Sequence, residues 1–171
     1  MERKDKMANW LEIIEDNRGK LQEVAEQAFR DAMGNRHMRF IVEVREDGEC
    51  FSWGDVAGGN SQTTTSWKGE SYQVGEFCFQ YMDIPITEKD LREHMTREEQ
   101  AQAEAKAEEY GDSFLGYVLS ECPDVVEKCE ENYLADYTRE NAAEEAEGLI
   151  DRRLEELKQE ETEQRYWEGI L

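Results

Sequence analysis

Five acidic side chains near the end of the chain are spaced so that they would lie on one side of a helix. They are Glu140, Glu144, Glu147, Asp151 and Glu155. At about 100° per residue these positions fall within roughly 80° of arc, and neighbouring carboxylates lie about 4.5–6 Å apart along the axis. Successive phosphates of a nucleic-acid strand have spacings of the same order. The pattern therefore predicts an anionic stripe that a basic protein surface could bind.

Further acidic residues accompany this stripe, with few basic residues to compensate them. Residues 87–171 contain 26 acidic and 10 basic side chains, in a chain of net charge -22. Glu104 with Glu108, and Glu127 with Glu131, repeat the helical spacing and are further candidate partner contacts. Lysine and arginine are scarce at the i+4 positions that usually neutralise such a face. The alternative interpretation, a merely solvated helix face, stays open.

No signature of catalysis or of metal binding occurs in the sequence. The two histidines, His37 and His94, fit neither H-E-x-x-H nor a Cys/His ligand spacing. Cys122 and Cys129 are seven positions apart with Pro123 between them, which disfavours a zinc site. A glycine-rich phosphate loop and a calcium-loop pattern are also missing. We therefore predict no enzyme, no metal and no cofactor, with a small carboxylate enzyme using a hard cation as the remaining catalytic alternative.

The four cysteines and the start of the chain indicate a cytoplasmic protein. Cys50, Cys78, Cys122 and Cys129 form no C-x-x-C pair and are expected to be reduced thiols. The stretch Met1–Lys6 is charged and precedes an amphipathic segment, which is not typical of a signal peptide. No apolar run is long enough to span a membrane, and anionic lipid would repel so acidic a chain.

The first half of the chain, residues 1–86, has the pattern of a helix followed by strands. Asn9 and Glu12 have capping-box spacing, and an apolar stripe from Leu21 to Met33 predicts a helix ending at Gly34-Asn35. Alternation and turn residues then predict four strands: Met38–Arg45, Cys50–Trp53, Gln62–Lys68 and Ser71–Met82. In the first of them, Arg39, Glu43 and Arg45 alternate with apolar residues, which predicts one buried face and one polar face. We expect a four-stranded antiparallel meander with the helix on one face.

The second half, residues 87–171, is predicted to be helical and acidic. A cap at Thr87 starts it, and the Ala-, Glu- and Gln-rich run from 97 to 109 predicts a largely exposed helix. A short apolar helix over 113–120, a break at Pro123, a helix over 124–137 and a final helix from about Thr138 to Tyr166 follow. Its predicted inward stripe consists of Ala142, Ala146, Leu149, Ile150 and Leu157. The predicted fold class is α+β, and the segments 1–86 and 87–171 are either two domains or one continuous domain.

Four aromatic residues are further candidates for binding. Trp53 and Trp67 flank a glycine-rich loop, and Tyr166-Trp167 lies near the C-terminus. Such residues often anchor protein interfaces. The favoured interpretation of Trp53 and Trp67 is that they are cross-strand neighbours in the sheet core.

The charge pattern over residues 87–171 resembles the acidic DNA-mimic inhibitors of phages and mobile elements, of the anti-CRISPR and antirestriction types. No sequence motif carries this resemblance. It implies inhibition of a DNA- or RNA-targeting nuclease, above all a CRISPR effector nuclease, through its basic nucleic-acid channel. Direct binding of nucleic acid by the chain is not expected, because like charges repel. The alternative is an acidic interaction module, such as an immunity or antitoxin protein, that binds a basic partner.

Overall fold

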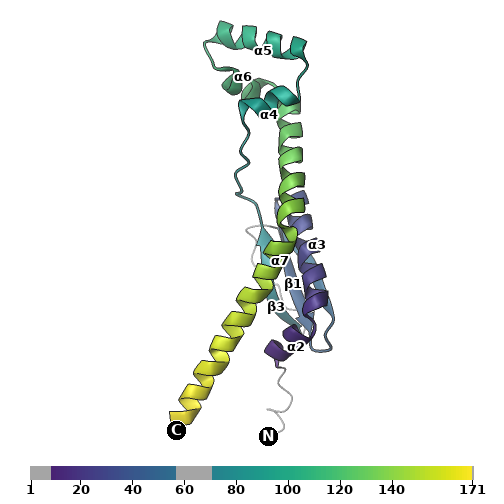
Figure 1. The fold of residues 1–171 in the computed structure, drawn as a ribbon, viewed down its shortest axis with the longest axis vertical. Coiled ribbons are helices and arrows are strands. Elements are labelled where there is room, and N and C mark those ends of the chain that lie inside the picture. Colours follow the sequence, from purple (N-terminus) through teal and green to yellow (C-terminus); the bar gives the residue numbers. More distant parts are fainter. Residues whose placement is uncertain (1–8, 57–70, 171) are drawn as a thin grey trace. The chain divides into compact units, whose positions relative to one another are not determined.

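The computed structural model describes residues 9–56 and 71–170, which combine helices with an antiparallel sheet (Figure 1). The predicted α+β class is confirmed. Two compact units divide the chain, and each is described by itself. Residues up to Tyr81 together with Glu140–Leu171 form the first, which we call the sheet unit; Met82–Arg139 form the second, which we call the helical unit. In this division the C-terminal segment from Glu140 is grouped with the sheet. The segments 1–86 and 87–171, with one continuous domain as the alternative, stay a prediction from the sequence.

The sheet unit begins with two helices, α2 (Trp10–Asp16) and α3 (Arg18–Gly34). The side chain of Asn9 accepts a hydrogen bond from the Glu12 backbone N–H at 3.1 Å, which confirms the predicted N-cap. Asn17 separates the helices because its backbone leaves the helical region and its side chain donates to the Ile13 carbonyl at 2.8 Å. The second helix ends at Gly34, as the apolar stripe predicted.

The described residues contain three strands: β1 (Met38–Arg45), β2 (Cys50–Val56) and β3 (Ser71–Cys78). The strand predicted at Gln62–Lys68 lies outside the described residues. All pairs are antiparallel and the order is β2-β1-β3. The prediction of a four-stranded meander is therefore not matched. The central strand is β1, which has buried side chains on both faces.

Two glycines occupy positions in this sheet that a larger residue would not fit. Gly48 has φ +89° in the turn between β1 and β2, a conformation that residues with a Cβ rarely adopt. Gly75 lies in β3, where a Cβ would come within 2.8 Å of the Leu149 side chain. Its missing side chain thus lets α7 (Pro123–Ile170) approach the sheet closely.

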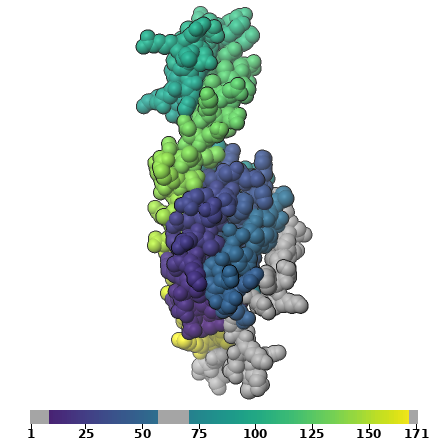
Figure 2. Space-filling view, turned by 90° about the vertical axis from the view of Figure 1, so that its right-hand side faces the viewer, coloured from purple at the N-terminus to yellow at the C-terminus, as the bar shows by residue number. Residues whose placement is uncertain are grey.

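Helices α3 and α7 cover the same face of the sheet. Phe29 of α3 meets Phe77 of β3 edge-to-face, with ring centroids 5.2 Å apart, and Leu149 of α7 lies against Gly75 on that face. The two helices also contact each other, since the Gln22 amide donates to the Ala143 carbonyl at 2.9 Å. Figure 2 shows the side chains of α3 packed beside those of the first two strands. The core of this unit lies between these layers.

The second face of β1 is more buried than its alternation predicted. Arg39 and Glu43, expected to face solvent, are 9% and 7% exposed. Arg39 forms ion pairs with Asp55 at 2.9 Å and Glu76 at 3.5 Å on the neighbouring strands. Glu43 accepts hydrogen bonds from the Trp53 indole and the Ser71 hydroxyl. Burial of these charges is tolerated because cross-strand partners bind them, although the Nε atom of Arg39 has no hydrogen-bond partner among the described residues.

The helical unit consists of α4 (Glu88–Glu93), α5 (Arg97–Tyr110), α6 (Phe114–Glu121) and the first part of α7. Capping boxes start α4 at Thr87 and α5 at Thr96, which confirms the predicted cap at Thr87. Their common core is small: Leu91, Met95, Ala103, Phe114, Val118 and Cys129. Only Ala103 and Ala107 of α5 are buried, so this helix is largely exposed, as predicted.

The predicted division between helices over 124–137 and from Thr138 is wrong. Helix α7 runs without interruption from Pro123 to Ile170. Pro123 occupies its first position, where a missing N–H costs no helical hydrogen bond. The predicted inward stripe is largely confirmed, since Ala142, Ala146, Leu149 and Ile150 are buried. Leu154 joins them, whereas Leu157 is only half-buried.

Candidate functional site

The five predicted stripe residues all lie on the exposed side of α7, within the sheet unit. We call Glu140, Glu144, Glu147, Asp151 and Glu155 the α7 stripe. Their side chains are largely accessible to solvent, and the buried side chains of the same segment point the other way, against α3 and β3. Packing on one side and helical hydrogen bonding together hold the carboxylates in a fixed row. The stripe is therefore a built surface rather than a charged tail.

Ion pairing within the described residues leaves most of this charge uncompensated. Asp151 pairs with Arg18 at 2.5 Å, where both side chains are substantially exposed. Among residues 9–56 and 71–170, the other four stripe carboxylates have no ion pair. An exposed pair of this kind contributes at most about 1 kcal/mol. Four of the five negative charges thus remain available to an external cation.

Two of the three basic residues of the same segment have partners outside the stripe. The Arg153 guanidinium donates to the Val74 carbonyl at 3.0 Å, pairs with Glu156 at 3.1 Å and lies over the Tyr72 ring. Lys158 lies 3.9 Å from Glu15. These contacts engage two of the three basic side chains that residues 140–163 contain beside ten acidic ones, while the third, Arg152, is exposed.

The linear charge density of the stripe can be compared with that of a nucleic acid. From Glu140 to Glu155 the helix rises by about 22 Å, at roughly 1.5 Å per residue. One strand of duplex DNA carries between six and seven phosphates over about that length, at roughly 3.4 Å each. The stripe places five carboxylates there. A basic groove that follows a strand would therefore meet a similar, slightly weaker line of charge.

The other four predicted contacts lie in the helical unit. Glu104 and Glu108 are exposed on α5, and Glu127 and Glu131 lie on the first part of α7. Glu104 is compensated by Arg92 at 3.1 Å, which also pairs with Glu88. The nine predicted residues thus divide between two units, five on one and four on the other.

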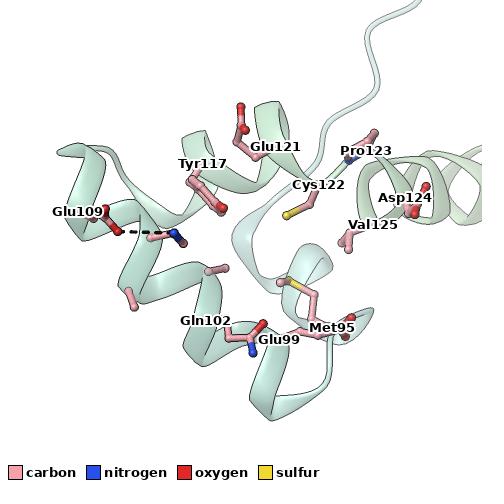
Figure 3. A pocket seen from close by; sticks show the side chains of 13 residues that line it. Met95, Glu99, Gln102, Glu109, Tyr117, Glu121, Cys122, Pro123, Asp124 and Val125 are labelled. Atoms are coloured by element: carbon pink, nitrogen blue, oxygen red, sulfur yellow. Dashed lines mark ion pairs between the residues drawn. The ribbon is translucent and has the colours of Figure 1, made fainter.

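Sequence reasoning missed a hollow between α5 and α6 in the helical unit. Its volume is about 580 Å³. Figure 3 shows the sulfur atoms of Met95 and Cys122 and the ring of Tyr117 turned toward this space. The other apolar residues of the lining are Ala103, Ala105, Pro123 and Val125. No sequence signal marks it, because α5, α6 and the start of α7 each contribute isolated apolar residues that only packing brings together.

The thiol and the phenol of the hollow are in their neutral forms at pH 7. Burial raises the pKa of the Cys122 thiol, and the nearby carboxylate of Glu121 adds to this effect. Burial also raises the pKa of Tyr117. A catalytic thiol would need the opposite shift toward thiolate. The arrangement suits packing against a ligand better than nucleophilic attack.

Among the described residues, no group of three or more histidine, cysteine, aspartate or glutamate side chains is arranged to hold a metal ion. No helix in that part of the chain combines the length and the apolar character needed to cross a membrane.

Of the two tryptophans that flank the glycine-rich loop, Trp53 is half-buried and its indole N–H donates a hydrogen bond to Glu43. Trp67 lies outside the described residues.

No protein-family model, curated protein or solved structure matches this chain.

Proposed function

We propose that this protein is a nucleic-acid-mimicking inhibitor of a DNA- or RNA-targeting nuclease, with a CRISPR effector nuclease as the expected class of target. The observation that carries the proposal is the α7 stripe, in which four carboxylates have no ion pair within the described residues. Because packing already holds this part of α7 in place, its backbone does not have to become ordered when a partner binds. Little backbone conformational entropy is therefore lost on binding. A positively charged channel that follows a nucleic-acid backbone is the complementary surface.

Electrostatic attraction alone would give such an inhibitor a high association rate but not a long residence time on its partner. A row of like charges steers a basic partner and raises the association rate, while buried apolar anchors slow dissociation. Tyr166 and Trp167 near the end of α7 are 64% and 60% exposed and lie edge-to-face to each other. They are suitable anchors beside the stripe.

The test compares a stripe variant with a matched control in an inhibition assay. The stripe variant combines Glu140→Gln, Glu144→Gln, Glu147→Gln, Asp151→Asn and Glu155→Gln. The control neutralises five acids of the first half in the same way: Glu12, Asp16, Glu23, Glu46 and Glu49. The control leaves Glu43 of the first half unchanged, because this residue is buried and accepts a hydrogen bond from Trp53. A panel of purified CRISPR effector nucleases is assayed for cleavage and for target-DNA binding.

We expect the wild type and the control to inhibit at least one nuclease by competition with its nucleic acid. The stripe variant should associate roughly tenfold more slowly at low salt and show a weaker dependence on salt. Equal loss in both variants would show that only net charge matters. Inhibition of no nuclease, or a shift of DNA by the chain itself at physiological salt, would reject the proposal.

The exposed Tyr166-Trp167 pair also fits the second candidate function, an acidic immunity or antitoxin protein. The two functions differ in what the partner loses. Competition with nucleic acid supports mimicry, whereas inactivation of a partner whose nucleic-acid binding is unchanged supports the immunity or antitoxin function.

A further inference from the structure

The hollow between α5 and α6 differs from the α7 stripe because it offers apolar surface. Its floor is formed by Met95, Ala103, Tyr117, Cys122 and Val125, and its volume is about 580 Å³. This volume lies within the range of ligand-binding pockets. Methionine sulfur and an aromatic ring adapt to partners of varied shape. An apolar side chain entering the hollow would find dispersion contacts on several sides.

The rim of the hollow is acidic. Four carboxylates surround it, those of Glu99, Glu109, Glu121 and Asp124, against the single ammonium of Lys106. Lys106 lies 3.7 Å from Glu109, so its charge is already shared. Figure 3 shows the Glu121 carboxylate turned outward rather than down to the floor. The floor is thus apolar while negative charge lies around the opening.

We propose that this hollow binds a basic amphipathic helix of a partner protein. One apolar side chain of that helix fills the floor, and lysine or arginine side chains on its flanks meet the rim carboxylates. The inference goes beyond the proposed function, because the site lies in the helical unit and depends on apolar contact as well as charge. Helix-in-groove recognition works through such anchors at helical spacing.

Charge complementarity selects this occupant over the alternatives. An anionic ligand would be repelled by four carboxylates and helped by one shared ammonium. A purely apolar segment would leave the rim carboxylates without partners and gain nothing from them. A basic segment without an apolar residue would leave the floor in contact with water. Only a segment with both features uses the whole surface.

The experiment titrates the full chain with an amidated peptide of leucine and lysine that forms four helical turns, with leucines at i, i+3, i+4 and i+7. A charge-matched peptide with serine in place of leucine is the probe control. Backbone amide NMR shifts locate the binding site. We expect the largest shifts at Gln102, Tyr117 and Val125, and at least tenfold weaker binding of the serine peptide.

Protein variants test the floor and the rim separately. Ala105→Phe places a ring at the hollow from an exposed position of α5, which should preserve the fold and weaken binding at least tenfold. Glu121→Gln with Asp124→Asn should weaken binding roughly threefold to tenfold, because exposed ion pairs contribute modestly. Glu93→Gln with Asp136→Asn, two exposed acids of the helical unit away from the hollow, is the charge-matched control, and its affinity should change less than twofold.

Three results would overturn the inference. They are equal binding of the leucine and serine peptides, shifts confined to positions 140–155 of α7, and unchanged affinity of the Ala105→Phe variant with its helix content intact. None of them concerns inhibition of a nuclease. The hollow can therefore fail as a docking site while the stripe retains its proposed function, and the reverse also holds.

Discussion

The sheet unit and the helical unit have similar net charges, although they differ about twofold in length. The sheet unit has 26 acidic and 14 basic side chains, a net charge of -12. The helical unit is about half as long, yet it has 16 acidic and 6 basic side chains, a net charge of -10. Self-repulsion for a given length of chain is therefore larger in the helical unit, where the core is smaller.

The difference shows two ways of displaying negative charge. In the sheet unit, α7 packs against the core through the buried side chains of Ala146, Leu149 and Ile150. Its opposite, exposed face carries the acidic side chains. In the helical unit, α5 buries only Ala103 and Ala107, and its other contacts include the capping box at Thr96 and the ion pair between Arg92 and Glu104. Binding of a basic partner should therefore stabilise the helical unit more.

The largest expected effect comes from matched core truncations, Leu91→Ala in the helical unit and Leu149→Ala in the sheet unit. Leu91 is 0% exposed and Leu149 is 3% exposed, so each change should cost about 3 kcal/mol. At roughly 0.05–0.15 kcal/mol per residue, the helical unit has only about 3–9 kcal/mol in total. We expect Leu91→Ala to leave the helical unit only about 0–6 kcal/mol, so that it opens far more often, while Leu149→Ala leaves the sheet unit folded.

Amide hydrogen exchange followed by NMR measures this difference along the backbone. Loss of protection should be confined to Met82–Arg139 in Leu91→Ala. If both units lost protection together in either variant, the units would fold as one cooperative structure and the comparison would not hold.

A smaller effect is expected at the α4 cap. Thr87→Ala removes the capping hydroxyl and should destabilise the helical unit by about 1 kcal/mol. Hydrogen bonds from the Thr87 backbone and hydroxyl lower the pKa of Asp90. A lowered folded-state pKa gives stability that is present above the unfolded value, about 3.9, and is lost as pH falls through the folded value.

Asp90→Asn tests that pH dependence. The variant should be less stable than the wild type at pH 7, and the difference should fade below about pH 4, when Asp90 of the wild type takes up its proton. Urea unfolding at pH 7 and pH 3 measures it. A difference that does not change with pH would mean that the Asp90 charge plays no part in the cap.

The smallest expected effect is the response to salt. Raising sodium chloride from 0.1 M to 1 M shortens the screening length from roughly 10 Å to about 3 Å. The thermal midpoint should rise by a few degrees, and more in the helical unit because its charge is denser. Calorimetry resolves the transitions. A midpoint that falls with salt would indicate that the acids stabilise the fold through ion pairs.

Local patterns in the sequence were sufficient for several elements. The caps at Asn9 and Thr87 and the end of α3 at Gly34 depend on residues within one helical turn, so they could be predicted. The exposure of the α7 stripe followed from the opposite apolar stripe of the same helix. Continuity of α7 through Thr138 was missed, because its apolar pattern changes where the helix passes from one unit to the other.

By itself, the sequence determined the charge, the helical spacing of the acids and the class of the elements, since these depend on composition and on period. Tertiary structure decided the rest. It placed β3 beside β1, paired Asp151 with Arg18 over 133 positions of sequence, and turned Arg153 toward Val74 and away from the stripe. It also assembled the hollow from three helices. Such contacts join residues far apart in the chain, and which of them form depends on how whole elements pack rather than on any local pattern.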